Sequence, residues 1–302
     1  MLEAGPAGID PGVVRVRLDI AYDGTGFSGW ARQPGLRTVQ GELEERLAAL
    51  FASTGATPRV TVAGRTDVGV HATGQVGHVD LGAGELAVLA RVRGHATSSG
   101  PDSLARRLTG MGGPVSDLVV RRSGVAPAGF DARFAALWRR YEYRIADAAG
   151  ERDPRRRDHT LWHPGPLDEA AMLDAAESLL GLHDFAAFCR PREGATTIRT
   201  LQAFSWQRDD SGVLVAEVRA DAFCHSMVRA LVGACIAAGE GRLAGGETAA
   251  LRDAGLRTSA FTVVPARGLT LVEVGYPSDD ELASRVERTR ARRDAGELQA
   301  AD

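Results

Sequence analysis

The chain of 302 residues contains no lysine, and all 36 of its basic residues are arginine. Without a lysine amine the chain cannot form a Schiff base with a substrate carbonyl, and it cannot carry a P-loop, whose motif requires lysine. Arginine presents a planar fork of donors that suits phosphates and flat bases, so the bias points toward nucleic acid. A GC-rich coding sequence would produce the same bias, and both explanations stay open.

Cysteines and long apolar runs are scarce. The three cysteines, Cys189, Cys224 and Cys235, are widely spaced without a CxxC pair, so we expect no disulfide framework. The chain opens without a signal peptide, and its most apolar stretch, residues 227–239, is too short to span a bilayer and carries Arg229. We therefore predict a cytoplasmic protein.

Positive charge is concentrated in one region. Residues 121–157 hold ten arginines and five acidic residues, although the whole chain has a net charge of −3. An acidic protein with one locally basic region is typical of a single polyanion-binding groove, because only the lining of a groove must be positive. A solvated basic surface is the alternative.

Periodicity indicates α+β organisation. Apolar and charged residues alternate over residues 14–22, which predicts a half-buried strand, and residues 201–208 and 213–220 form a predicted hairpin. Thr38 and Asp168 each precede an amphipathic stretch and are typical helix caps. Each half of the chain follows the order strand, helix, strand, strand, helix, strand. We predict two similar α/β halves that share a mixed, mostly antiparallel sheet with flanking helices.

The predicted boundaries divide the chain into four parts. They are a disordered tail (1–12), an N-terminal half (13–125), a C-terminal half (126–277) and a charged tail (278–302).

The segment AGRTDVGVHA, residues 63–72, is the most informative for chemistry. It follows a short predicted strand, and its glycines allow a substrate to approach the backbone closely. An aspartate such as Asp67 is ionised at neutral pH in water, so it can act as a nucleophile without an activating base. Two alternatives remain open: Asp67 as a turn residue, or a metal site with His71, His78 and Asp80, against which the glycines argue because they disfavour a helix there.

Five motifs in order along the chain resemble those of one family, the TruA-type tRNA pseudouridine synthases. The segment GRTDVGVHA (64–72) resembles the signature motif of this family. The sequence departs from the residues usual in the family at Val68, Cys224 and Ser226. The other matching segments are YDGTGFSGWARQ (22–33) with TVQ (38–40), FDARF (130–134) with RRYEY (139–143), AFCHSMVR (222–229), and GLTL (268–271) with YP (276–277).

The resemblance implies an isomerase that converts uridine to pseudouridine at positions 38, 39 and 40 of the tRNA anticodon stem-loop. It also implies a central RNA-binding cleft, tRNA as partner, a homodimer, and a reaction without cofactor or metal. Two rival functions remain: a non-catalytic RNA-binding protein on the same scaffold, and a metal-dependent hydrolase that uses Asp67, His71 and His78.

The resemblance also implies roles for individual residues. Asp67 matches the essential catalytic aspartate, and whether it attacks ribose C1′, attacks uracil C6 or removes the 2′ proton stays open. Arg229 matches a basic residue that pairs with this aspartate, and Tyr141 matches an aromatic residue that stacks on uracil. Arg65 would occupy the space of the extruded nucleotide. Two further arginines in the basic region would bind phosphates: Arg133 and Arg139.

Overall fold

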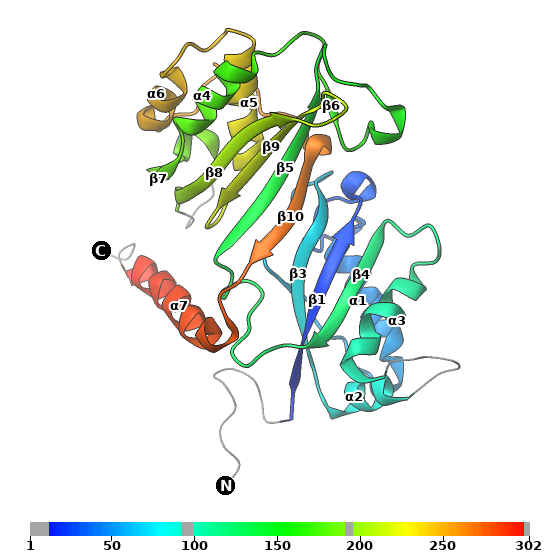
Figure 1. Cartoon of the computed structure of the whole chain (residues 1–302). Helices are drawn as coiled ribbons and strands as arrows, with labels where there is room; N and C mark the ends of the chain where they lie inside the picture. Colours follow the sequence, from blue (N-terminus) through cyan, green and yellow to red (C-terminus); the bar gives the residue numbers. More distant parts are fainter. Residues whose placement is uncertain (1–11, 92–98, 191–195, 299–302) are drawn as a thin grey trace. The chain divides into compact units, whose positions relative to one another are not determined.

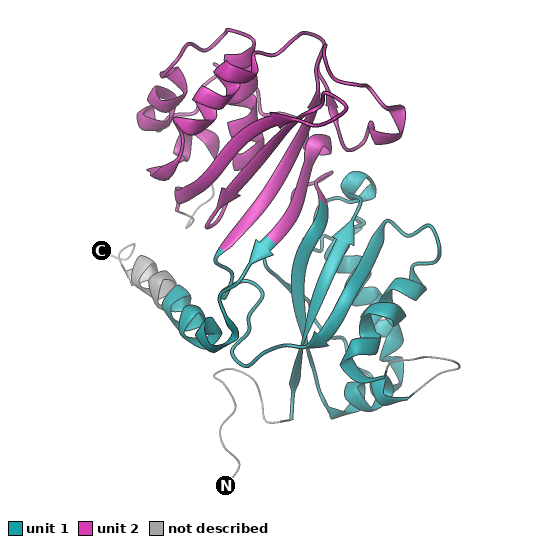
Figure 2. Cartoon of the chain, in the orientation of Figure 1, with its two compact units in different colours: residues 1–66, 72–137, 274–302 teal, residues 67–71, 138–273 magenta. Residues whose placement is uncertain are grey.

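The computed structural model describes residues 12–91, 99–190 and 196–298, so most of the predicted N-terminal tail lies outside the described residues. The chain divides into two compact units (Figure 2). Unit 1 comprises the described residues up to Thr66, Ala72–Leu137 and those from Val274 onward. Unit 2 comprises Asp67–His71 and Trp138–Glu273. The short segment that carries Asp67 therefore belongs to unit 2, although unit 1 surrounds it in the sequence.

Unit 1 contains an antiparallel sheet built around its first strand (Figure 1). The central strand β1 (Val14–Tyr22) has the bounds predicted from its alternation, and the apolar residues of its buried face are inaccessible to solvent. It pairs with β3 (His71–Leu81) on one side and β4 (Leu118–Val125) on the other, and β2 (Thr61–Val62) pairs with β3. The predicted strand over residues 14–22 is confirmed.

Helices of unit 1 cover this sheet, and one of them confirms a predicted cap. The Thr38 hydroxyl accepts a hydrogen bond of 3.2 Å from the Gly41 N–H at the start of α1. This bond satisfies one of the backbone donors that a helix leaves unpaired at its N-terminus. The α-helices of unit 1 are α1 (Val39–Leu50), α2 (Ala83–Ala90), α3 (Leu104–Met111) and α7 (Leu282–Leu298).

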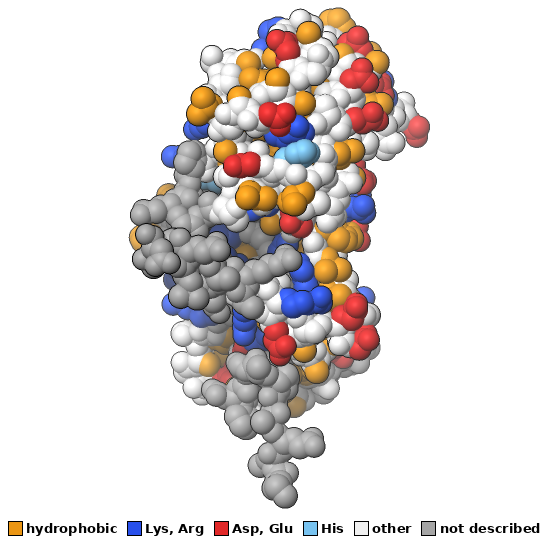
Figure 3. Space-filling model, turned by 90° about the vertical axis from the view of Figure 1, so that its left-hand side faces the viewer, with side chains coloured by type: hydrophobic (Ala, Val, Ile, Leu, Met, Phe, Trp, Pro, Cys, Tyr) orange, Lys and Arg blue, Asp and Glu red, His pale blue; other side chains and the backbone are white. Residues whose placement is uncertain are grey.

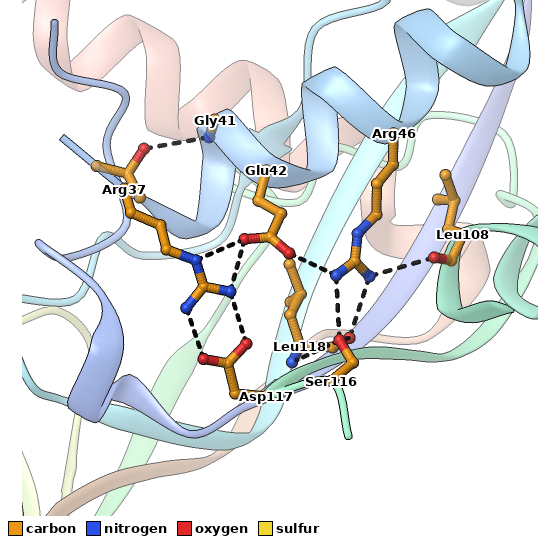
Figure 4. A network of polar contacts seen from close by, with 9 residues as sticks. Arg37, Gly41, Glu42, Arg46, Leu108, Ser116, Asp117 and Leu118 are labelled. Atoms are coloured by element: carbon orange, nitrogen blue, oxygen red, sulfur yellow. Dashed lines mark hydrogen bonds and ion pairs between the residues drawn. The ribbon is translucent and has the colours of Figure 1, made fainter. Parts of the chain in front are cut away.

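An arginine network joins α1 to the segment that leads into β4 (Figure 4). Arg37 donates two hydrogen bonds to Asp117, at 2.6 and 2.7 Å, and a third to Glu42. The buried Arg46 donates to Glu42 at 2.6 Å, to the Ser116 hydroxyl, and to two backbone carbonyl groups. Nearly all donors and acceptors of this network are paired, as a structural ion-pair network requires.

The sheet of unit 2 is also built around its first strand, β5 (Trp138–Ala146). The predicted hairpin is confirmed as the antiparallel pair β8 and β9. Because β6 pairs with β5 in parallel, the sheet is mixed and mostly antiparallel. The other strands are β6 (Leu161–Trp162), β7 (Gly181–Asp184), β8 (Ile198–Arg208), β9 (Leu214–Ala220) and β10 (Leu269–Gly275).

Three helices belong to unit 2: α4 (Glu169–Glu177), α5 (Met227–Gly239) and α6 (Glu247–Ala254). Asp168 caps α4 by accepting the Ala171 N–H at 3.1 Å, as predicted. All residues of α5 except Arg229 are buried. The helix packs so closely on a neighbouring segment that a Cβ at Gly233 would overlap the Thr262 carbonyl oxygen.

The two units share one arrangement of strands. In unit 1 the first strand lies between β3 and the last strand, β4, and in unit 2 the first strand lies between β9 and the last strand, β10. The predicted α+β class is therefore confirmed. Across the residues that the structure describes, no helix has the length and apolar character needed to cross a membrane.

Candidate active site

A tight turn presents Asp67. The Val70 N–H donates to the Asp67 carbonyl oxygen at 3.2 Å, and Gly69 lies in the left-handed region with φ of 77°. A side chain would be strained at this backbone conformation, which explains glycine at this position. The turn leaves the Asp67 side chain 33% exposed, so its carboxylate is fixed by the backbone but open to a ligand.

Three residues at the beginning of α5 contact the Asp67 carboxylate. Arg229 donates from Nη2 to Oδ2 at 3.2 Å, and the Ser226 hydroxyl donates to the same oxygen at 3.4 Å. His225 Nε2 lies 3.5 Å from Oδ1. The structure thus brings Arg229 and Asp67 together, as the resemblance implied. Sequence reasoning missed His225 and Ser226, although both lie inside the motif AFCHSMVR.

The two oxygens of Asp67 have different surroundings. Oδ2 accepts from both a guanidinium and a hydroxyl group. Oδ1 lies 3.5 Å from His225 Nε2, which is longer than both contacts of Oδ2. Oδ1 therefore keeps lone pairs that can reach a ligand, while Oδ2 anchors the carboxylate.

Arg229 is held firmly although it is charged. Its side chain is 20% exposed on an otherwise buried helix, and it donates to the Val264 carbonyl group at 3.2 Å and to the Ser226 hydroxyl at 2.9 Å. A charge in such a position is costly unless it is paired, and Asp67 supplies the opposite charge. Arg229 is therefore not a solvated surface arginine.

Tyr141 lies in β5 and contacts the loop that precedes α5. Its ring is 8% exposed and meets the Phe223 ring edge-on, with centroids 5.2 Å apart. Tyr143, two residues along, lies on the same face of the strand. Burial raises the pKa of Tyr143, and the positive charges of Arg267 and Arg229 oppose this effect. The face of β5 that carries Tyr141 is thus the face near Arg229.

The remaining predicted site arginines are divided between the units. Arg139 precedes Tyr141 by two residues and donates to the Asp221 carbonyl group at 2.8 Å, so it contacts the loop that carries His225. Arg65 and Arg133 belong to unit 1, where both side chains are exposed.

Comparison with known proteins identifies the family. A family model described as tRNA pseudouridine synthase matches residues 175–277. A protein of Leifsonia xyli subsp. xyli named tRNA pseudouridine synthase A is 63% identical over 280 residues, which cover 92% of this chain and 97% of the relative. The chain belongs to the tRNA pseudouridine synthase family. Relatives of the same name from Frankia casuarinae and Mycobacterium leprae are 56% and 48% identical, over 93% and 92% of this chain and 96% and 94% of their own lengths.

Two of the four residues considered as metal ligands, Asp80 and His78, have hydrogen-bond partners in unit 1. Both carboxylate oxygens of Asp80 accept hydrogen bonds of 2.7 Å from Arg15. The Nδ1 atom of His78 accepts a hydrogen bond of 3.1 Å from the Ala132 N–H. Burial, together with the charge of Arg15, lowers the pKa of His78 to about 4. Asp80 and the Nδ1 atom of His78 thus have structural partners inside unit 1.

Much of the basic region of the synthase is neutralised in three dimensions. Arg140, for example, contacts Glu217 and Glu273 at 3.0 Å each, both from distant parts of the sequence. Figure 3 shows acidic and basic side chains among one another on one face of unit 2. Five of the ten arginines lie within 4.0 Å of a carboxylate: Arg122, Arg140, Arg144, Arg155 and Arg157.

The structure has one disulfide, although the sequence predicts no disulfide framework. The structure joins Cys189 to Cys224, which are 35 residues apart with Cα atoms 5.7 Å from each other. The Arg190 N–H also donates to the His225 carbonyl oxygen at 3.0 Å. Sequence spacing could not reveal this pairing, because folding alone brings the two segments together. The loop before α5 is thereby linked to the segment that contains Cys189 and Arg190.

A cavity of about 480 Å³ adjoins this loop. Ser226 forms part of its wall, and Arg190 and Arg257 line it together with threonine and serine hydroxyl groups. No acidic residue is among the described residues that line it. The cavity therefore suits an anion with hydroxyl groups.

Proposed function

We propose that this synthase isomerises uridine to pseudouridine at positions 38, 39 and 40 of the tRNA anticodon stem-loop, with Asp67 as its catalytic residue. The observation that carries the proposal is the Asp67 carboxylate, which Arg229 and Ser226 anchor through Oδ2 while Oδ1 keeps accessible lone pairs. Family membership supports the activity, since the relatives bear the name tRNA pseudouridine synthase A.

The chemistry needs little beyond such a carboxylate. The bond from ribose C1′ to uracil N1 breaks, the base turns, and C1′ joins C5 while C5 loses its proton to N1 or solvent. Asp67 Oδ1 would attack C1′, attack uracil C6, or take the 2′ proton, and each route begins with an ionised carboxylate. Arg229 balances that negative charge and keeps it in place.

The other site residues would bind the RNA. Tyr141 would stack on the uracil ring, and Arg65 would fill the space that the extruded nucleotide leaves. Arg133 and Arg139 would contact phosphates of the stem-loop. The cavity beside Ser226 supports an RNA ligand as well, because its arginines and hydroxyl groups suit phosphate and ribose.

The proposal includes a homodimer that works in the cytoplasm, as the resemblance implies. Sedimentation of the purified chain tests the oligomeric state, and a mass of one 31.9 kDa chain would contradict the dimer.

Pseudouridine mapping tests the function directly. Purified protein is incubated with a transcribed tRNA that has uridines at positions 38, 39 and 40, and pseudouridine is expected at those positions only. A transcript with cytidines at the three positions is the control. The absence of pseudouridine from the first transcript, or equal formation elsewhere in both, would contradict the proposal.

A further inference from the structure

Ser226 has an unusual backbone conformation. Among the residues that the structure describes, it is the only non-glycine residue with positive φ, at φ 64° and ψ 8°. Side chains other than glycine, asparagine and aspartate rarely adopt this left-handed conformation because their Cβ is crowded. Such residues persist where the surrounding structure fixes them, and they are concentrated at functional sites.

The surroundings of Ser226 fix it from both sides. Before it, Cys224 is bonded to Cys189, and the His225 carbonyl oxygen accepts the Arg190 N–H. After it, its own carbonyl oxygen accepts the Ala230 N–H at 3.0 Å in the first turn of α5. The conformation is therefore part of the fold of unit 2.

The Ser226 hydroxyl does not serve the helix that it precedes. Asp168 occupies the equivalent position before α4 and accepts a backbone N–H, whereas Ser226 makes no such bond to α5. Its Oγ lies between two other groups, accepting from Arg229 Nη2 at 2.9 Å and donating to Asp67 Oδ2 at 3.4 Å. A serine with an ordinary cap conformation would direct this oxygen to the helix backbone.

We propose that Ser226 is a positioning residue for Asp67, and that its left-handed backbone serves to place its hydroxyl between the carboxylate and Arg229. The hydroxyl uses its one proton toward Oδ2 and a lone pair toward the guanidinium. It thereby limits rotation of the carboxylate, so that Oδ1 stays directed away from the anchor. The inference rests on the proposed catalytic role of Asp67.

Two substitutions separate the hydroxyl from the backbone. Ser226→Ala removes the hydroxyl and keeps the crowded Cβ, and Ser226→Gly removes both. Because both variants lack the hydroxyl, we expect kcat for pseudouridine formation to fall by roughly ten- to a hundred-fold in each, with KM and tRNA affinity unchanged. Ser226→Asn, which tolerates the left-handed region and can donate and accept, should recover part of the lost kcat.

A matched cap variant provides the control. Asp168→Ala removes a hydrogen bond that serves only α4, so it should lower the melting temperature and leave kcat unchanged. Wild-type kcat in Ser226→Gly would overturn the proposal, since the hydroxyl would then be dispensable. So would a loss confined to KM, or a loss in Ser226→Asn as large as in Ser226→Ala.

The experiments distinguish a wrong proposed function from a wrong role for Ser226. If the wild-type protein forms no pseudouridine, the function is wrong. If it does, and Asp67→Asn is inactive while the two hydroxyl-free variants turn over normally, only the role of Ser226 is wrong.

Discussion

Each unit holds an arginine–carboxylate network beside a helix, and the two networks differ in completeness. In unit 1, both carboxylate oxygens of Asp117 accept hydrogen bonds from Arg37, at 2.6 and 2.7 Å. In unit 2, Oδ2 of Asp67 accepts hydrogen bonds from Arg229 at 3.2 Å and Ser226 at 3.4 Å, and Oδ1 lies 3.5 Å from His225 Nε2. The two carboxylates are equally exposed, at 32% and 33%. Exposure alone therefore does not distinguish a structural carboxylate from one available to a ligand, whereas the number of occupied oxygens does.

The largest expected effect comes from removing each carboxylate charge in turn. Asp67→Asn should reduce single-turnover pseudouridine formation by on the order of 10⁴-fold or more, because the reaction loses its ionised carboxylate. Its free energy of unfolding should change by less than about 1 kcal/mol. Asp117→Asn should show the reverse, with normal turnover and a loss of about 1–2 kcal/mol in urea unfolding. Equal stability losses in the two variants would remove the distinction between the networks.

The second largest expected effect comes from replacing an arginine in each network. Arg46 is 7% exposed, and Arg46→Leu would remove one hydrogen-bond donor each from Glu42, the Ser116 hydroxyl and two backbone carbonyl groups. In urea unfolding, we expect the free energy of unfolding to fall by about 3 kcal/mol or more. The kcat of the molecules that remain folded should equal that of the wild type. Arg229→Leu should instead lower kcat by on the order of 10²-fold or more. If the kcat of folded Arg46→Leu fell as much as that of Arg229→Leu, the distinction between a structural and a catalytic arginine network would be wrong.

A smaller effect concerns pH and a second structural carboxylate, Asp147 in unit 2. Burial opposes its ionisation, but two hydrogen bonds from Arg208 and backbone N–H groups outweigh this and lower the pKa of Asp147 to about 2. A carboxyl group with a lowered folded-state pKa stabilises the fold above its unfolded pKa, near 3.8, and this contribution is lost as pH falls toward 2.

Asp147 should therefore contribute roughly 2 kcal/mol near neutral pH, and its 1% exposure leaves little solvent screening. Unfolding free energies measured between pH 5 and pH 2 should fall less steeply for Asp147→Asn than for the wild type, by about that amount. Asp67→Asn is the matched control. Parallel wild-type and Asp147→Asn curves would show that Asp147 is not the group responsible.

Several features could be predicted from the sequence because neighbours along the chain determine them. The alternation over residues 14–22 predicted β1 to its last residue, and Thr38 and Asp168 cap the helices that follow them. The motif around Asp67 also identified the family. Helix propensity carries no sign that Ser226, which directly precedes α5, adopts positive φ.

Charge read along the chain was a poorer guide. The arginines of residues 121–157 predict one basic groove, yet acids from distant segments pair with three of them, Arg122, Arg140 and Arg144. The same holds for two of the ligands considered for a metal site, since Arg15 and a backbone N–H already contact Asp80 and His78. Partners of a charged side chain come from the packing of segments, which sequence spacing does not describe.

The α+β class, β1, the β8–β9 hairpin and the caps of α1 and α4 could be predicted from the sequence, because they follow from local periodicity and cap residues. The predicted order of six elements in each half omitted α2, β6, β7 and α6. The resemblance implied that Arg229 pairs with Asp67, whereas the contacts of Ser226 and His225 with Asp67 are found only in the tertiary structure. Arg229 and Ser226 lie 162 and 159 residues away along the chain. Their contact depends on how a turn before β3 meets the first turn of α5 within unit 2, and on a left-handed residue that no local preference would predict.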